Sequence, residues 1–421
     1  MGDQRALRAV PHGEQSKPGF MLRLLEIVAA ARVFWVLSAA GAAMFVTGIG
    51  LAIHLVPYLP PPAGPFPVGT MLWDANRSGG DSLSASRGRC PLSVQLWYPA
   101  EPGGGDGLAP YRPSGASLLS AERWVRTGAT LNSALSTHRV RYPVLVSLPG
   151  WAGVRDENTT FMQDLASRGF VVAGIGYDDP ACAGVDRRAA DTAATDLDLS
   201  SPTAFERTLG VANQKIERVA EAASDVVDGL EALDRFDTTG RFRGRLDLAR
   251  LGVVGYSLGG AIAIQLCWRD DRLKAAVNID GWFFDAAPGR WIEQPFMFIS
   301  DDGPPATAAD LTNSNPARRY HAELDETTER RMSSELAKHG GVTITVLGSD
   351  HLDFSDMVYL SRAALLQGRR PDGAAIRTAA DYSAAFFAQI LNGEESNLFS
   401  NPPPGVRLHS WDRALRQESS K

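Results

Sequence analysis

A serine between glycines marks the place where this sequence could carry out nucleophilic chemistry. Residues 251–266 read LGVVGYSLGGAIAIQL, so an apolar strand pattern runs into GYSLG (255–259) and a helix-forming stretch follows at once. This is the G-x-S-x-G pattern in the strand–turn–helix setting that lifts a serine hydroxyl above the edge of a sheet. The alternative is a structural glycine-rich turn that happens to contain a serine. We predict that Ser257 is a nucleophile.

A serine hydroxyl needs a base that takes its proton, and histidine is the usual base. In chains with this turn the order along the sequence is serine, then acid, then histidine. The histidines that follow Ser257 are His321, His339, His351 and His409. Only His351 comes directly after an apolar strand pattern, in VTITVLGSDHLDF, where a loop at the carboxyl edge of the sheet would carry it to the serine. His351 is therefore the predicted general base.

Spacing alone leaves open which carboxylate would orient His351. Asp280 ends the strand pattern AAVNID, whereas Asp301 and Asp302 follow the next pattern, FMFIS. A carboxylate at either edge could hold the imidazole and stabilise its protonated form. Alternatively, each of these carboxylates is solvated at the start of a loop or caps a helix.

Ester hydrolysis through a serine forms a tetrahedral oxyanion, which two N–H donors would stabilise. One donor would be the amide of Leu258, directly after the serine. The other would come from the loop after the strand pattern YPVLVSL, which reads PGWA over residues 149–152. Because proline has no N–H, Trp151 is the predicted second donor, with Ala152 next.

Short apolar runs and helical patterns alternate along the part of the chain that holds these residues. The predicted strands are 92–98, 142–148, 170–176, 251–254, 275–279, 295–299 and 342–347, and the predicted helices are 160–168, 208–233, 259–268 and 374–391. Several strands are nearly all apolar, which is typical of a mostly parallel sheet with helices on both faces. The predicted fold class is therefore α/β.

The N-terminal part of the sequence predicts a membrane anchor. Residues 33–53 carry no charge, and a helix of this length spans roughly 31 Å, about the thickness of a bilayer core. Basic residues lie before the span, and the first one after it is Arg77. Basic flanks stay cytoplasmic, so the bulk of the protein would face outward. A cleaved signal peptide is the alternative, although its apolar region is shorter and ends in a small-residue cleavage site.

The predicted organisation follows from these patterns and from a stretch of six prolines within residues 57–67, which would be extended and stiff. Its parts are a cytoplasmic segment (1–32), a transmembrane anchor (33–56), a proline-rich stalk (57–70), a catalytic domain (71–395) and a tail (396–421). Residues 301–341 carry mixed charge and no strand pattern, so we interpret them as an excursion over the sheet and a candidate lid.

Composition excludes several classes of function. The chain has 421 residues, of which 44% are hydrophobic and 21% charged, as in ordinary globular proteins. A net charge of −6 provides no basic surface for nucleic acid. Seven scattered histidines and three separated cysteines (Cys90, Cys182 and Cys267) predict neither a metal site nor a cysteine-rich scaffold. One disulfide can form, and its pairing is open.

Longer passages of the sequence are shared with a known family. They lie between residues 93 and 360 and read VQLWYP, YPVLVSLPGWAGVRDENTTFMQDLASRGFVVAGIGYDD, GVVGYSLGGAIAIQL, AAVNIDGWFFD, QPFMFIS and GSDHLDFSD. In these passages the chain resembles the plasma and type II platelet-activating factor acetylhydrolases, within the α/β-hydrolase superfamily. The resemblance implies an α/β-hydrolase fold, a triad of Ser257, Asp280 and His351, and oxyanion amides at Leu258 and Trp151. It favours Asp280 over Asp302 because the family's acid lies in a D-x-W setting.

Two positions depart from the family's pattern. Tyr256 stands where the family usually has a histidine before the nucleophile, and Pro149 replaces the histidine of its oxyanion loop. Both changes alter the lining of the pocket, so specificity for acetylated phospholipids is left open. The passage LASRGFVVAGI is also similar to bacterial cutinase-like polyesterases, which place the acid one strand later, where Asp301 and Asp302 stand.

Together, these patterns predict a membrane-anchored serine esterase that hydrolyses carboxylic esters, either short-acyl or similar to acetylated phospholipids, and needs neither a metal nor an organic cofactor. The predicted partners are a small ester or lipid substrate and a membrane, with no nucleic acid. The alternatives are a cutinase-like carboxylesterase, an acyltransferase with the same triad, and a surface protein that keeps the fold only for binding. Acyl chain length, leaving group, physiological substrate and oligomeric state are not determined by the sequence.

Overall fold

Two units make up the chain in the computed structural model, Met1–Val56 and Pro57–Lys421. The structure describes residues 32, 34, 35, 38, 41, 44, 59–73, 90–112, 124–183, 197–284, 290–360 and 373–411. Most of the predicted cytoplasmic segment and anchor, and part of the predicted tail, therefore lie outside the described residues. Among those that are described, no helix combines the length and the apolar character that crossing a bilayer requires.

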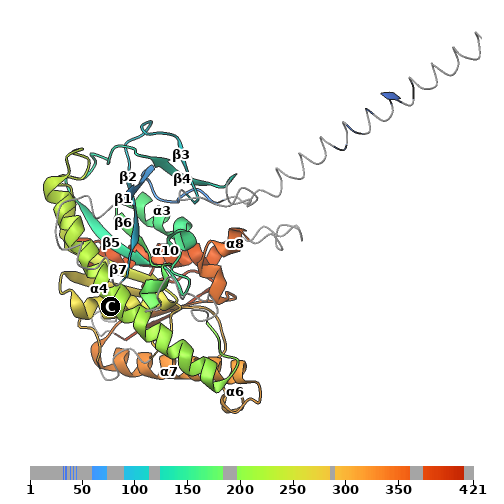
Figure 1. The fold of residues 1–421 in the computed structure, drawn as a ribbon. Helices are drawn as coiled ribbons and strands as arrows, with labels where there is room; N and C mark the ends of the chain where they lie inside the picture. Colours follow the sequence, from blue (N-terminus) through green and yellow to red (C-terminus); the bar gives the residue numbers. More distant parts are fainter. Residues whose placement is uncertain are drawn as a thin grey trace, which may run out of the picture. The chain divides into compact units, whose positions relative to one another are not determined.

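A mixed sheet runs through the larger unit (Figure 1). Within the described residues it has 11 strands in the order β11-β10-β9-β8-β7-β5-β6-β2-β1-β4-β3. Neighbouring strands from β6 to β10 are parallel, whereas β2 pairs antiparallel to β6 and β11 pairs antiparallel to β10. The bounds are β1 Val68–Trp73, β2 Ser93–Pro99, β3 Leu108–Pro110, β4 Arg126–Leu131, β5 Tyr142–Leu148, β6 Val171–Gly176, β7 Leu246–Tyr256, β8 Leu273–Ile279, β9 Phe296–Ser300, β10 Val342–Val346 and β11 Val406–Ser410.

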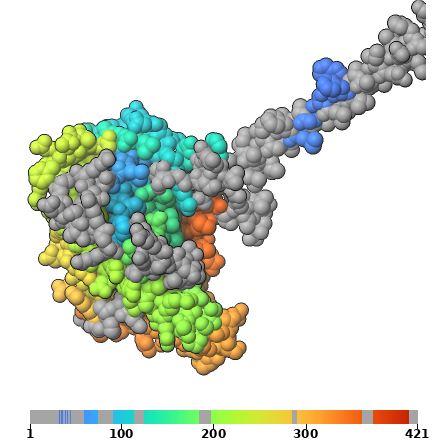
Figure 2. Space-filling model, in the orientation of Figure 1, coloured from blue at the N-terminus to red at the C-terminus, as the bar shows by residue number. Residues whose placement is uncertain are grey.

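Helices cover both faces of this sheet, and the strands therefore bury side chains on both sides. Along β7, Val253 packs in one apolar cluster with α4 and α5, and Val254 packs in the opposite cluster with α3 and α10. The outer side of α4 reaches the surface, where it is yellow-green in Figure 2. This arrangement confirms the predicted α/β class. The helix bounds are α3 Thr159–Ser167, α4 Pro202–Phe236, α5 Leu258–Arg269, α6 Ala308–Leu311, α7 Pro316–His339, α8 Met357–Leu360 and α10 Ala374–Phe387, with short turns η4 Arg155–Asn158, η5 Pro180–Ala183, η7 His351–Phe354 and η8 Ala388–Asn392.

The region interpreted as a candidate lid, residues 301–341, forms the connection between the parallel strands β9 and β10. Most of it is α7, a helix of 24 residues. Leu324 and Leu336 of α7 are buried in the same apolar cluster as α4 and α5. Few other side chains of this charged helix are buried, which explains why its apolar pattern was too weak to predict a crossover helix.

Part of the predicted stalk, residues 59–70, belongs to the folded unit. Leu59 is 3% exposed, and β1 begins at Val68. The N–H of Ala63 donates to Oδ1 of Asp164 at 2.6 Å, and this carboxylate lies on α3. A proline-rich chain is extended in either setting, so composition alone did not separate a spacer from a segment that packs on a helix.

A disulfide joins Cys90 to Cys182, with the Sγ atoms 2.04 Å apart, and Cys267 is a buried free thiol. The pairing follows from the sheet. Ser93 at the start of β2 pairs with Gly176 at the end of β6, so the chain before β2 lies beside the turn η5 that follows β6. Local sequence could not show this, because the two cysteines are 92 positions apart.

Candidate active site

Ser257 lies in the sharp turn between β7 and α5. Its backbone has φ 54° and ψ −125°, a region that residues with a side chain rarely adopt. Its N–H donates to the carbonyl oxygen of Ile279 on β8 at 2.8 Å, which holds the turn. A Cβ on Gly255 would lie 1.9 Å from the carbonyl oxygen of Gly259, and one on Gly259 would lie 2.3 Å from that of Leu148. Close backbone approach therefore requires both glycines of the pentapeptide.

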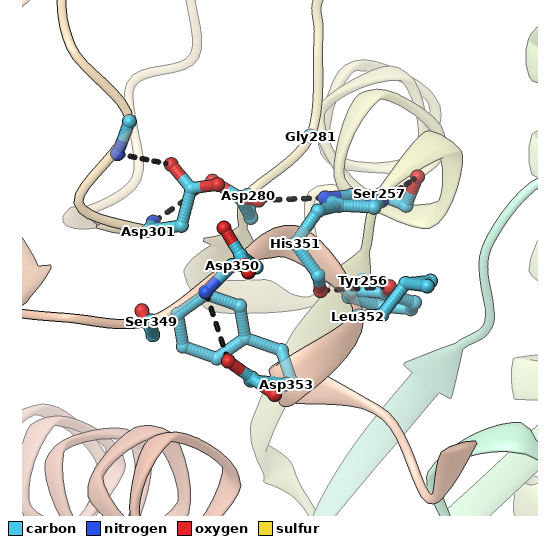
Figure 3. A network of polar contacts seen from close by, with 12 residues as sticks. Tyr256, Ser257, Asp280, Gly281, Asp301, Ser349, Asp350, His351, Leu352 and Asp353 are labelled. Atoms are coloured by element: carbon cyan, nitrogen blue, oxygen red, sulfur yellow. Dashed lines mark hydrogen bonds and ion pairs between the residues drawn. The ribbon is translucent and has the colours of Figure 1, made fainter. Parts of the chain in front are cut away.

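The structure brings Ser257, His351 and Asp280 together, as Figure 3 shows. His351 Nε2 lies 3.1 Å from Ser257 Oγ, and His351 Nδ1 lies 2.6 Å from Asp280 Oδ2. The three residues follow β7, β8 and β10, which run parallel, so their carboxyl ends meet at one edge of the sheet. In this arrangement an imidazole can take a proton from the serine while a carboxylate holds its other nitrogen.

Tyr256, the residue before the nucleophile, contacts both the ring and the backbone of His351. Its ring stacks on that of His351, with centroids 5.0 Å apart and planes 24° from parallel. Its hydroxyl donates to the backbone carbonyl oxygen of His351 at 3.0 Å (Figure 3). Burial raises the pKa of Tyr256, so this hydroxyl keeps its proton. Tyr256 therefore positions both the ring and the backbone of His351.

The candidate acids occupy different places. Asp280 uses Oδ2 for His351, and its Oδ1 accepts the N–H of Asp301 at 3.0 Å. Burial and the charge of Asp280 raise the pKa of Asp301, whose carboxylate accepts the N–H of Gly303. Asp302 accepts the N–H of Gly348 at 3.0 Å. Asp302 is thus hydrogen-bonded to the loop before His351, whereas Asp280 contacts the imidazole itself.

The loop after β5 lies against the nucleophile. A Cβ built on Gly150 would be 3.3 Å from the Cβ of Ser257. The N–H of Gly150 donates to Oε2 of Glu157 at 2.8 Å, and the amide of Trp151 follows it in the loop. Leu258 is the first residue of α5, so its N–H has no carbonyl partner one turn earlier in the helix.

Three polar residues that are buried or partly buried support this loop, and sequence reasoning missed all three. Glu157 accepts from Gly150, Tyr177 donates to the loop's carbonyl groups, and Lys215 Nζ donates to the carbonyl oxygen of Trp151 at 2.8 Å. Burial raises the pKa of Glu157. No local motif marks Glu157 or Lys215. Tyr177, however, directly follows the apolar strand β6. His351 was predicted as the base because it also follows an apolar strand, so the same signal could have identified Tyr177.

Within the part of the chain that the structure describes, no three carboxylate, imidazole or thiol groups are placed to share a metal ion. The groups that the structure brings together at this edge of the sheet are a serine, an imidazole and a carboxylate, beside the backbone N–H groups of the loop and of α5.

Comparisons with known proteins identify similar chains. The family model for platelet-activating factor acetylhydrolase, isoform II, matches residues 89–397. A platelet-activating factor acetylhydrolase of Canis lupus familiaris is 27% identical over 254 residues, which cover 56% of this chain and 52% of that protein. A bis(hydroxyethyl) terephthalate hydrolase of Streptomyces coelicolor is 26% identical over 223 residues, covering 52% and 57%. The matched region spans about half the length of each relative.

Among solved structures, a ferulic acid esterase from Streptomyces cinnamoneus is similar in fold. The TM-score is 0.55 at 24% sequence identity, and the match covers 84% of this chain and 99% of that one. At this identity the likeness shows the fold alone.

Proposed function

The chain belongs to the family of platelet-activating factor acetylhydrolases, isoform II, and we propose that it is a serine esterase that hydrolyses carboxylic esters through an acyl-enzyme. The observation that carries the proposal is the continuous contact from Asp280 through His351 to Ser257, with distances of 2.6 Å and 3.1 Å. Such contact activates a hydroxyl that is otherwise a poor nucleophile.

The proposed reaction begins when Ser257 Oγ attacks the ester carbonyl carbon and its proton passes to His351 Nε2. The N–H groups of Leu258 and Trp151 stabilise the resulting oxyanion. The bond to the alcohol oxygen then breaks, and His351 returns the proton to that oxygen. Water attacks the acyl group on Ser257 in the same way, which releases the acid and restores the hydroxyl. Asp280 orients the imidazole and stabilises its charged form throughout.

The substrate class is an ester with a small acyl or aromatic group. One similar protein bears the name of an acetylhydrolase and another that of a terephthalate hydrolase. Aromatic rings gather beside the triad: Trp151 lies 6.2 Å from Phe284, and Trp282, two residues after Asp280, lies 6.0 Å from Phe284 between centroids. These rings favour an apolar or planar group on the substrate.

A fluorophosphonate probe tests this function directly. The probe should form a covalent adduct on the tryptic peptide that contains Ser257, because only an activated serine reacts with it. Mass spectrometry of the labelled peptide is the measurement, with Ser257→Ala as the unlabelled variant and Asp302→Asn as a control that should label like the wild type. A protein that keeps the fold only for binding would remain unlabelled, and that outcome would reject the esterase proposal.

We propose further that residues 33–53 anchor the protein in a membrane, with the N-terminus cytoplasmic and the catalytic domain on the other side. The uncharged span and the basic residues before it support this orientation. The disulfide between Cys90 and Cys182 supports it independently, because structural disulfides persist mainly in oxidising compartments.

Alkaline carbonate extraction of membranes tests the anchor. The full chain should stay in the membrane pellet, since a retained apolar helix is not released when peripheral contacts are broken. A variant with Ala42→Arg and Val46→Arg should move to the soluble fraction, because charges in mid-span disfavour insertion. Release of the unaltered chain would contradict the anchor. N-terminal sequencing of the mature protein separates an anchor from a cleaved signal.

A further inference from the structure

The peptide that joins Gly150 to Trp151 is held on its carbonyl side by a tyrosine. Tyr177 follows β6, which pairs in parallel with β5, so the loop after β5 lies beside it. The side chain is 1% exposed, and its Oη lies 2.6 Å from the carbonyl oxygens of both Pro149 and Gly150. With a single proton, the hydroxyl donates to one of these two oxygens at a time.

The loop also closes around the backbone of Tyr177. The N–H of Tyr177 donates to the carbonyl oxygen of Gly153 at 2.8 Å, and the N–H of Gly153 donates to that of Gly150 at 2.9 Å. Gly153 has φ +69°, and a Cβ there would lie 2.5 Å from a ring carbon of Tyr177. Packing and hydrogen bonds therefore define one position of the tyrosine relative to the loop.

Two charged residues hold the peptides on either side. Glu157 accepts the N–H of Gly150 at 2.8 Å, and the ammonium group of Lys215 donates to the carbonyl oxygen of Trp151 at 2.8 Å. This ammonium group also lies 4.7 Å from the centroid of the Trp151 ring. In a trans peptide the N–H points away from its own carbonyl group. Since the carbonyl of Gly150 faces Tyr177, the N–H of Trp151 points to the opposite side.

We propose that Tyr177 is a positioning residue of the oxyanion hole: its hydroxyl holds the carbonyl group of Gly150 and so directs the N–H of Trp151 to the oxyanion that forms on Ser257. The proposal rests on the esterase function above. If this peptide rotated, a carbonyl oxygen would replace the N–H and repel the oxyanion instead of stabilising it. Burial and the charge of Glu157 raise the pKa of Tyr177, so the hydroxyl remains a donor.

The test compares Tyr177→Phe with Tyr142→Phe. Tyr142 is the first residue of β5, at the end of the strand far from the loop, and its buried hydroxyl donates to the carbonyl oxygen of Ser136 at 3.0 Å. Each substitution removes one buried hydroxyl and keeps the ring. The measurements are kcat and KM for p-nitrophenyl acetate, and the inhibition constant of a trifluoromethyl ketone, which forms an oxyanion on the serine.

Tyr177→Phe should lower kcat by between about 10- and 100-fold with KM nearly unchanged, because the interaction forms only in the transition state. Its affinity for the trifluoromethyl ketone should fall by a similar factor. Tyr142→Phe should leave both quantities within about threefold of the wild type. If Tyr177→Phe matched Tyr142→Phe in kcat and in inhibition, the proposal would be overturned.

Two further variants keep the outcome decisive. If Tyr177→Phe does not fold, Lys215→Met tests the same loop from its other carbonyl group: a joint fall in kcat and ketone affinity supports the positioning of the loop, and unchanged values reject it. Ser257→Ala, measured beside them, separates the two proposals. Hydrolysis that survives in Ser257→Ala rejects the esterase mechanism, whereas loss there with normal Tyr177→Phe rejects only the role of Tyr177.

Discussion

Ser257→Ala is expected to lower kcat for p-nitrophenyl acetate by about 10⁴-fold or more. The substitution removes the Oγ atom that lies 3.1 Å from His351 Nε2, so no acyl-enzyme can form. The residual rate would come from the oxyanion donors and from substrate binding, which the alanine leaves in place. Initial rates at saturating substrate measure the effect.

Ser349→Ala provides the matched control for Ser257→Ala. Ser349 lies two residues before His351, and its hydroxyl donates to the carbonyl oxygen of Val346 at 2.8 Å rather than to any triad atom. Its kcat should stay within about threefold of the wild type, since only a hydrogen bond outside the triad is lost. Unchanged hydrolysis in Ser257→Ala would remove the proposed mechanism altogether.

Asp280→Asn should cost nearly as much, with a fall in kcat of about 10⁴-fold. The carboxylate accepts a hydrogen bond from the Nδ1–H group of His351 at 2.6 Å, and this contact keeps Nε2 free to take the proton of Ser257. An amide group at position 280 can favour the other tautomer, in which Nε2 already carries a proton and cannot act as the base. Steady-state kinetics with the same ester measures the loss.

Asp302→Asn is the control that separates the two candidate acids. Asp302 accepts the N–H of Gly348, and the carbonyl oxygen of an asparagine can still do so. We expect kcat within about threefold of the wild type. The reverse pattern, with a large loss in Asp302→Asn and a small one in Asp280→Asn, would assign the acid to the strand where cutinase-like polyesterases carry it.

Local patterns predicted the parts of the site whose geometry depends on neighbouring residues. The sharp turn around Ser257 could be predicted from the sequence because close backbone contacts within and beside the pentapeptide require glycine at positions 255 and 259. The role of His351 as the base could be predicted because it follows an apolar strand, and the carboxyl ends of parallel strands meet at a common edge of the sheet. The strand predicted at 142–148 has the bounds of β5, where all seven side chains are buried.

The remaining parts depend on contacts between segments far apart in sequence. Asp280 follows β8 and Asp302 follows β9, and the carboxyl ends of these parallel strands lie at the same edge of the sheet. Spacing in the sequence therefore could not choose between the two candidate acids. Lys215 on α4 contacts the donor loop across 64 positions of sequence. Glu157 on η4 lies only seven positions from Gly150, but no local motif marks its contact with the loop. The edge strand β11 and strand β4, which lies next to the other edge, were missed because their side chains are only partly buried and their apolar runs are correspondingly weak.

The disulfide between Cys90 and Cys182 closes a covalent ring that contains some of the residues of the site and leaves the others outside. The covalent ring that it closes, from Cys90 to Cys182, contains the donor loop, Glu157 and Tyr177. Ser257, Asp280 and His351 all lie outside that ring. A cross-link over so long a loop restricts mainly the unfolded chain. Reductive cleavage would therefore lower the free energy of unfolding mainly by releasing the unfolded chain. The connectivity of the segments that carry Ser257, Leu258, Asp280 and His351 would stay as before.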